Sequence, residues 1–483
     1  MRVSNASLLK NILSLTVSNG FAQAAGFIGN LIIARIITVE LFALYNLSIY
    51  LSSLFAVIGL FGLKIVIIKR VAQKPEEFNS IFATSLILHT IFSLFACVGL
   101  AIYMLYVRDY PFVFFLLTGV LLLEMVYIEF FEGLVIGLER MELGAAVRII
   151  SRVLWLAFIL ILVNLKMQLS LLLVSLITSQ LFLIILGFVI LNKKRYFSLE
   201  MMKVSKKLAR NVLSAAFPFF LASIFSILTT TFGRVLLSIY SSTAEVGYFS
   251  IVDRIYTPFS IIVISIWSST FPVFSRYYTL GKEQHDKFYL KAFRGQLLFF
   301  LPLCLLISMN SKTILRIGFG EKYVPAAPVL SLFIWYLILY FIYLLIHNVL
   351  ASAGKQKMIL YLTALSSLIY NIFFFILQRQ KGAYGLALAY IIGGLITIPI
   401  HFYILKEYVS IKETIKIAFN YSIILFILVF PILIKILRPT IYYSFLAVIL
   451  YFIGLNLLHL VENEKKWVIG MTKKYFPIYT NSK

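Results

Sequence analysis

Residues 41–63 read LFALYNLSIYLSSLFAVIGLFGL and contain no charged side chain. A helix that crosses the roughly 30 Å hydrocarbon core of a bilayer needs about 20 such residues. Similar runs recur along nearly the whole chain, and 61% of its 483 residues are apolar while 13% are charged. Soluble proteins contain about 45–50% apolar and about 25% charged residues. The composition therefore excludes soluble enzymes, nucleic-acid-binding proteins and disordered tails, and it predicts an all-α integral membrane protein.

Fourteen apolar runs predict 14 transmembrane helices, and the fifth of them is the shortest. The predicted spans are 12–34, 41–63, 81–105, 111–137, 149–165, 169–191, 211–240, 246–272, 288–309, 325–350, 358–378, 383–405, 416–436 and 440–460. Because the number is even, both termini are expected on the same side of the membrane.

The distribution of basic residues predicts which side that is. The net charge of +24 would favour nucleic-acid binding in a soluble protein, but Lys and Arg are also enriched in the cytoplasmic loops of membrane proteins. The segments on the side of the termini hold 31 basic residues, whereas the segments on the opposite side hold 11. Both termini are therefore predicted to be cytoplasmic.

A short internal repeat predicts two lobes. Residues 10–14 (KNILS) recur as residues 210–214 (RNVLS), with six predicted helices between the two copies. Both copies then enter the bilayer from the same face, as in transporters whose two lobes are parallel repeats. The predicted organisation is an N-terminal lobe of helices 1–6 (1–195), a cytoplasmic amphipathic linker (196–210), a C-terminal lobe of helices 7–12 (211–410), and helices 13–14 with a cytoplasmic tail (411–483).

No catalytic, metal or cofactor motif is recognisable in the sequence. The two cysteines, Cys97 and Cys304, lie within apolar runs, and the five histidines are scattered one to a segment. The loops predicted outside the membrane are also short for a membrane glycosyltransferase or polymerase. The sequence therefore predicts a protein that is not an enzyme and that carries no metal or cofactor.

Ionisable residues within the predicted spans are the candidate functional residues, because each costs at least a few kcal/mol in the bilayer unless it faces protein or water. Asp253 and Arg254 precede Pro258, whose missing N–H leaves the Arg254 carbonyl without its helical partner. Arg35 and Arg234 occupy nearly matching positions in the two lobes and could border one central cavity. The alternatives are a structural ion pair for Arg254 and contact with lipid headgroups for Arg35 and Arg234.

Two further ionisable positions have open interpretations. Glu124 lies deepest among the acidic residues of the fourth span, where it is either a proton or cation site or, as we favour, a counter-charge to a basic residue. Lys64, near the inner end of the second span, either extends toward the headgroups or lines the inner mouth of a cavity. Arg148 and Arg152, one turn apart, are interpreted as contacts to lipid of the inner leaflet.

Several short motifs in this order resemble those of the polysaccharide-transporter family of lipid-linked oligosaccharide flippases, within the multidrug/oligosaccharidyl-lipid/polysaccharide exporter superfamily. They begin with Lys10-Asn11 and Ala34-Arg35-Ile36, which is followed by residues 40–45 (ELFALY). Residues 244–248 (AEVGY), 319–323 (FGEKY), 326–330 (AAPVL) and 382–387 (GAYGLA) complete the set. The resemblance spans nearly the whole chain but indicates no particular sugar.

The resemblance implies that the chain moves an undecaprenyl-diphosphate-linked O-antigen or capsule repeat unit from the cytoplasmic to the periplasmic leaflet of a bacterial inner membrane. It implies Arg35, Lys64, Arg234 and Arg254 as basic residues of a substrate cavity, with Asp253 beside them. The implied partners are the lipid-linked oligosaccharide and membrane lipid, together with a polysaccharide polymerase and chain-length regulator. The alternatives are a multidrug exporter of the same superfamily and an O-antigen polymerase.

Overall fold

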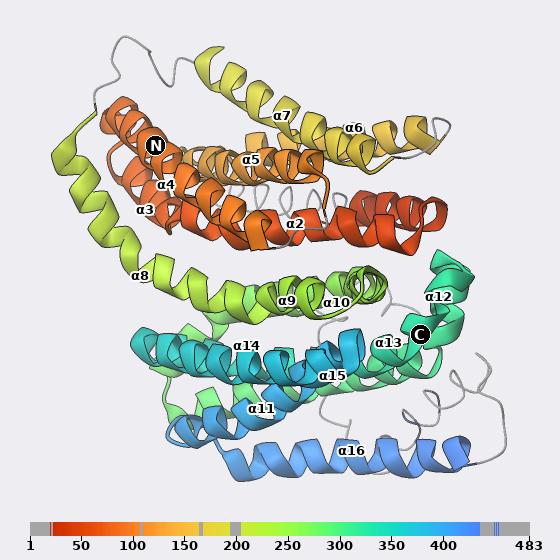
Figure 1. Cartoon of the computed structure of the whole chain (residues 1–483). Coiled ribbons are helices and arrows are strands. Elements are labelled where there is room, and N and C mark those ends of the chain that lie inside the picture. Colours follow the sequence, from red (N-terminus) through yellow and green to blue (C-terminus); the bar gives the residue numbers. More distant parts are fainter. Residues whose placement is uncertain are drawn as a thin grey trace, which may run out of the picture. The chain divides into compact units, whose positions relative to one another are not determined.

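The structure is a computed structural model that describes residues 20, 23–106, 110–163, 168–193, 204–434, 449, 451 and 453. Within these residues all regular elements are helices (Figure 1). Ten of the described helices are long and apolar enough to cross a membrane, and the helix Gln23–Ile36 is apolar but shorter. The predicted all-α membrane fold is confirmed.

The chain divides into two compact units. The first consists of Met1–Arg254 with Thr363–Ala389, and the second of Ile255–Leu362 with Tyr390–Lys483. The long helices α10 (Thr243–Thr279) and α15 (Gln356–Leu405) each contribute residues to both units. Besides the helix Gln23–Ile36, the first unit contains α2 (Val39–Leu60), α3 (Leu63–Gln73), η1 (Pro75–Glu77), α4 (Phe78–Tyr106), α5 (Phe112–Gly137), α6 (Met141–Val163), α7 (Leu169–Lys193), α8 (Lys206–Thr230) and α9 (Phe232–Tyr240).

In the first unit, α5 lies between α7 and the pair formed by α2 and α4, and α6 packs along α7 (Figure 1). The turn between α2 and α3 is compact because Gly62 adopts a φ of +67°. A Cβ at Gly62 would lie 2.6 Å from the backbone nitrogen of Phe220 in α8, so a larger residue would push α8 away. Phe61 stacks on Phe92 and Phe220 at ring distances of 4.2 and 4.3 Å. This turn therefore fixes α8 against α2 and α3.

A break between α8 and α9 is held by amide side chains of α15. Thr231 separates the two helices, with a φ of −115°. Asn371 donates to the carbonyl of Leu228 at 3.2 Å, and Gln378 donates to the carbonyl of Gly233 at 2.9 Å. Carbonyl groups near a helix break need new hydrogen-bond donors when they are out of reach of water. These two bonds fix the position of α9, the helix that carries Arg234.

The kink within α15 is held by a carboxylate of α10. Gly382 has a φ of +53° and a ψ of −132°, a conformation that only glycine adopts readily. The Glu245 carboxylate accepts a hydrogen bond from the Ala383 backbone N–H at 2.7 Å, and a Cβ at Gly382 would lie 2.7 Å from its Oε2 atom. The motifs at residues 244–248 and 382–387, far apart in the sequence, therefore meet here.

The second unit is built around α11 (Lys282–Met309), which lies between α14 (Tyr336–Ser352) and α16 (Ile411–Ile434) (Figure 1). The short helices α12 (Ser311–Phe319), η3 (Glu321–Ala326) and α13 (Ala327–Phe333) join α11 to α14. Asn348 of α14 donates to two groups of α10, the Trp267 carbonyl at 2.8 Å and the Thr270 hydroxyl at 3.0 Å. A polar side chain thus links α14 to α10.

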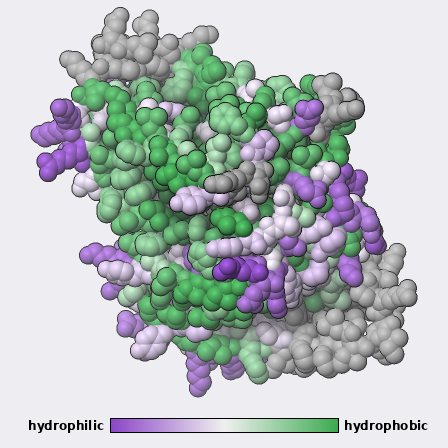
Figure 2. Space-filling view, in the orientation of Figure 1, coloured by the Kyte–Doolittle hydropathy of each residue, from purple (hydrophilic) through white to green (hydrophobic). Residues whose placement is uncertain are grey.

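Apolar side chains form much of the outer surface. Large apolar side chains with high exposed fractions include Leu105, Phe112 and Leu94, at 73%, 68% and 63%. Figure 2 shows hydrophobic residues over much of the visible face. In water this surface would favour aggregation, whereas in a bilayer the hydrocarbon tails replace water as its solvent. The chain is a multi-pass membrane protein.

The predicted spans and the observed helices agree in order. Span 211–240 is divided into α8 and α9, and spans 358–378 and 383–405 are the two parts of the kinked α15. Residues 12–19, residues 196–203 of the linker and most of span 440–460 lie outside the described residues, so the count of 14 is not confirmed. The predicted lobes, with boundaries at 195, 210 and 410, remain a prediction.

Candidate functional site

The first unit contains a group of polar side chains from α2, α9 and α10. Asp253 of α10 accepts a hydrogen bond from Arg234 of α9, at 2.6 Å between Nη2 and Oδ1. Its other oxygen, Oδ2, accepts a hydrogen bond from the Tyr50 hydroxyl of α2 at 3.3 Å. The Arg234 guanidinium also lies over the rings of Tyr50 and Phe249, at 5.6 and 5.8 Å. Both charged side chains are only 13% exposed, and the carboxylate of Asp253 balances the positive charge of Arg234.

Arg254, the next residue, points to a different partner. Its Nε and Nη2 atoms both donate to Oδ1 of Asn46 in α2, at 3.1 and 2.5 Å. The Nδ2 group of Asn46 donates to the carbonyl of Phe42 in its own helix at 2.7 Å, which holds Oδ1 toward Arg254. Asn46 is fully buried, and its amide is neutral. Arg254 is therefore oriented by a hydrogen-bond acceptor that leaves its positive charge uncompensated.

A second arginine lies near Arg254. Arg152 of α6 interacts electrostatically with Arg254 and with Tyr45 of α2, and its guanidinium lies 6.0 Å from the ring centre of Trp155. Within the described part of the chain, neither Arg152 nor Arg254 forms an ion pair with a carboxylate. Both side chains are partly buried. Two like charges held close together repel each other, so this pair favours binding of an anion.

Lys64 and Arg148 belong to a separate ionic network. Lys64 of α3 lies 2.5 Å from Glu129 and 2.9 Å from Glu132, both in α5. Arg148 of α6 binds the other oxygen of Glu132 at 2.7 Å. All four side chains are 20–40% exposed. Two basic and two acidic groups balance here, so this network joins α3, α5 and α6 without a net charge.

Arg35 and Glu124 are the remaining predicted site residues. Arg35 is exposed, near the C-terminal end of the helix Gln23–Ile36. Glu124 of α5 is 2% exposed, and both its carboxyl oxygens lack a hydrogen-bond partner among the described residues. The favoured interpretation of Glu124 as a counter-charge finds no basic partner within the part of the chain that the structure describes, and its role stays a prediction.

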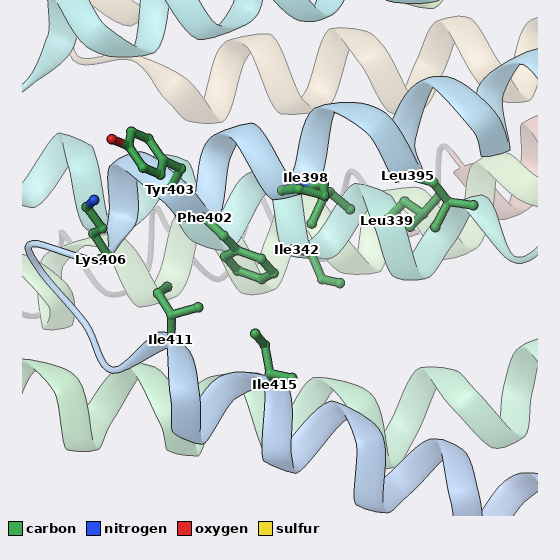
Figure 3. A pocket seen from close by; sticks show the side chains of 10 residues that line it. Leu339, Ile342, Leu395, Ile398, Phe402, Tyr403, Lys406, Ile411 and Ile415 are labelled. Atoms are coloured by element: carbon green, nitrogen blue, oxygen red, sulfur yellow. The ribbon is translucent and has the colours of Figure 1, made fainter.

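An apolar pocket of about 660 Å³ lies in the second unit (Figure 3). Side chains of α14, α15 and α16 line it, and Lys406 is the charged residue among them. The lining residues are Leu339, Ile342, Leu395, Ile398, Pro399, Phe402, Tyr403, Lys406, Ile411 and Ile415. Such a lining suits hydrocarbon, whereas the arginines described above lie in the first unit. The pocket is therefore not the ionic site.

Sequence reasoning missed two members of the Arg254 group. Asn46 is a polar residue within the uncharged run 41–63, and polar side chains inside a membrane span commonly face other helices. Arg152 was interpreted as a contact to lipid together with Arg148, but it interacts with Arg254 while Arg148 binds Glu132. The sequence offers no signal that separates two arginines one turn apart.

Comparisons with known proteins agree with the fold. The family profile described as polysaccharide biosynthesis protein matches residues 8–278, more than half of the chain, and the MatE profile matches residues 218–377. A candidate O-antigen transporter of Shigella dysenteriae is 22% identical over 387 residues, which cover 79% of this chain and 95% of that protein. The family resemblance predicted from the motifs is thereby confirmed.

Two solved structures have a similar fold. The lipid II flippase MurJ in an inward closed conformation is 17% identical, with a TM-score of 0.69 over 95% of this chain and 100% of that chain. An inward-facing multidrug resistance transporter of the MATE family is 16% identical, with a TM-score of 0.66 over 81% of this chain and 96% of that chain. These relatives are named as transporters and a flippase, in agreement with the prediction that this chain is not an enzyme.

Proposed function

Because the chain belongs to the polysaccharide biosynthesis protein family, we propose that it is a flippase for an undecaprenyl-diphosphate-linked oligosaccharide. It moves this lipid from the cytoplasmic to the periplasmic leaflet during synthesis of O-antigen or capsule. We further propose that it lies in the bacterial inner membrane with both termini in the cytoplasm. A polysaccharide polymerase and a chain-length regulator would act on its product.

The observation that carries this proposal is the uncompensated pair Arg152 and Arg254. A diphosphate that leaves water loses strong hydrogen bonds, which guanidinium groups can replace because their N–H groups match the geometry of phosphate oxygens. Asn46 holds Nε and Nη2 of Arg254 and leaves the rest of the guanidinium for a ligand. We infer that the diphosphate binds at these two arginines while its lipid tail stays in the bilayer.

The neighbouring charges then have supporting roles. Arg234 is neutralised by Asp253, and this pair joins α9 to α10 next to Arg254. Lys64 is neutralised by Glu129 and Glu132, so it offers less attraction to an anion than Arg254. We propose Arg254 and Arg152 as the primary contacts of the diphosphate and the other predicted cavity residues as secondary.

Depletion of the protein tests the function directly. We expect complete undecaprenyl-diphosphate-linked repeat units to accumulate in the cytoplasmic leaflet, where a glycosidase added to the periplasm cannot reach them. Accumulation in the periplasmic leaflet would instead place the block after translocation and indicate a polymerase or ligase. Absence of accumulation would exclude glycan transport.

The variant Arg254→Gln tests the site. Loss of surface polysaccharide is expected at unchanged protein abundance, and Arg254→Lys should retain part of the activity because it keeps the charge. Arg276→Gln is the matched control, because Arg276 lies in the same helix but is exposed. Unchanged polysaccharide in the Arg254→Gln strain would remove the site assignment.

A multidrug exporter is the second candidate, favoured by the MatE match over residues 218–377 and by the MATE transporter fold. Many exported drugs are cations, which two uncompensated arginines would repel. Increased drug susceptibility of a deletion strain with normal surface polysaccharide would establish this alternative.

A further inference from the structure

Glu124 of the first unit is a buried acidic residue without a hydrogen-bond partner among the described residues. It lies in the middle of α5, about 18 Å from the start of this 26-residue helix at 1.5 Å per residue. The residue is 2% exposed, and neither carboxyl oxygen has a hydrogen-bond partner within the described ranges. An ionised carboxylate in such surroundings would lose several kcal/mol of solvation with nothing to replace it. Such surroundings favour the neutral carboxylic acid over the carboxylate.

The helices around α5 supply no counter-charge within the described residues. Glu124 is seven residues before Phe131 and eleven before Val135, so it shares their helix face. Phe131 and Val135 form a buried cluster with Val147 of α6 and with Ile184 of α7. Glu124 thus faces α6 and α7, and between Leu169 and Asn192 the sequence of α7 contains no charged residue.

The helices that pack against α5 carry several titratable and charged groups whose side chains the structure describes. They are Glu40, Tyr45 and Tyr50 of α2, Lys64, Lys69 and Arg70 of α3, His89, Cys97, Tyr103 and Tyr106 of α4, and Arg148 and Arg152 of α6. None of them interacts electrostatically with Glu124 among the described residues. The imidazole of His89 packs on Phe130, and its Nδ1 atom lies 2.7 Å from the Ser85 carbonyl oxygen.

We propose that Glu124 is a proton-binding site that couples substrate translocation to proton movement. In the conformation described here its carboxyl oxygen holds the proton. In a conformation that admits water to the space between α5, α6 and α7, the O–H bond breaks and the proton passes to water, which leaves a carboxylate. The ionised form then disfavours return to the present dry packing until a proton is bound again. This inference rests on the proposed flippase function.

The first test needs no transport. Infrared spectroscopy of the purified protein in lipid nanodiscs detects the C=O stretching band of a protonated carboxyl group. We expect this band in the wild-type protein at neutral pH, its loss in Glu124→Gln, and its persistence in Glu129→Gln. Glu129 is the matched control, because it lies in the same helix but is 40% exposed and bound to Lys64. A wild-type spectrum without the band, or an unchanged band in Glu124→Gln, would overturn the assignment.

The second test measures coupling in proteoliposomes that enclose a pH-sensitive dye. A fluorescent undecaprenyl-diphosphate-linked disaccharide serves as the probe, and its translocation in the wild type should respond to an imposed pH gradient at least several-fold. Glu124→Gln should still equilibrate the probe but lose this response. An equal response in the variant contradicts the coupling role, whereas failure of the wild type to move the probe contradicts the proposed function instead. If Glu124→Gln does not assemble, Glu124→Asp replaces it in the infrared test. This variant keeps a carboxyl group and should shift the C=O stretching band.

Discussion

The substitution Asn46→Asp adds one negative charge beside Arg254 with almost no change in shape. In the wild type, the neutral Oδ1 atom accepts hydrogen bonds from Arg254 at 3.1 and 2.5 Å. An aspartate would accept the same bonds and would also neutralise the guanidinium. Its loss of the donor to the Phe42 carbonyl costs about 1 kcal/mol, which the new ion pair offsets, so the fold should persist.

The size of the effect follows from the distance between the new charge and a bound phosphate. A phosphate oxygen at the free side of the guanidinium would lie about 6 Å from the introduced carboxylate, allowing for one hydrogen bond beyond the guanidinium. At an effective dielectric constant of about 20, the repulsion is about 2.8 kcal/mol for each unit of negative charge. Each 1.4 kcal/mol is tenfold, so affinity should fall about 100-fold.

Binding of undecaprenyl diphosphate to the purified protein in nanodiscs measures this change, with unfolding temperature as the stability check. Asn46→Ala is the neutral control, because it removes the orienting acceptor without adding charge, and we expect a smaller loss of affinity. Equal losses in Asn46→Asp and Asn46→Ala would refute the electrostatic reasoning. Wild-type affinity in Asn46→Asp would refute the location of the diphosphate site.

Three other perturbations test the surrounding structure. Asp253→Asn removes the carboxylate that balances the largely buried charge of Arg234, so it should lower the free energy of unfolding by about 3 kcal/mol. The double variant with Arg234→Gln should recover part of this loss, as reversible unfolding in mixed micelles would show, and additive losses would mean that the pair is not coupled. Gly382→Ala should destabilise the protein by about 1–3 kcal/mol, because alanine does not tolerate this backbone conformation and its Cβ would meet the Glu245 carboxylate. An unchanged unfolding free energy would show that the kink can relax. Lys64→Met should cost about 1 kcal/mol or less and weaken diphosphate binding less than Arg254→Gln does, since Lys64 is partly exposed and already paired. A greater loss of binding than in Arg254→Gln would make Lys64 a primary ligand.

Much of the fold could be predicted from the sequence because membrane insertion depends on local composition. Each run of about 20 apolar residues predicts a helix wherever the run occurs, and the observed helices follow the predicted order. The breaks within helices were harder to predict from the sequence than the helices themselves. Thr231 ends α8 inside a predicted single span, and the amides of Asn371 and Gln378 that hold this break come from α15, more than 140 residues away.

The candidate site was predictable only in part. The rarity of charge inside apolar runs singled out Asp253, Arg254, Arg234 and Glu124. The same rule could not find Asn46, because its side chain is uncharged, or separate Arg152 from Arg148.

The sequence by itself determined that this chain lies in a membrane, where its helices run and which of them contain ionisable groups, because the transfer of each segment into lipid depends on that segment alone. Only the tertiary structure decided which charges are matched. Asp253 and Arg254 are adjacent, yet successive residues of a helix point about 100° apart, so one meets Arg234 and the other meets Asn46. Their partners come from other helices, and electrostatic energy depends on those distances in space.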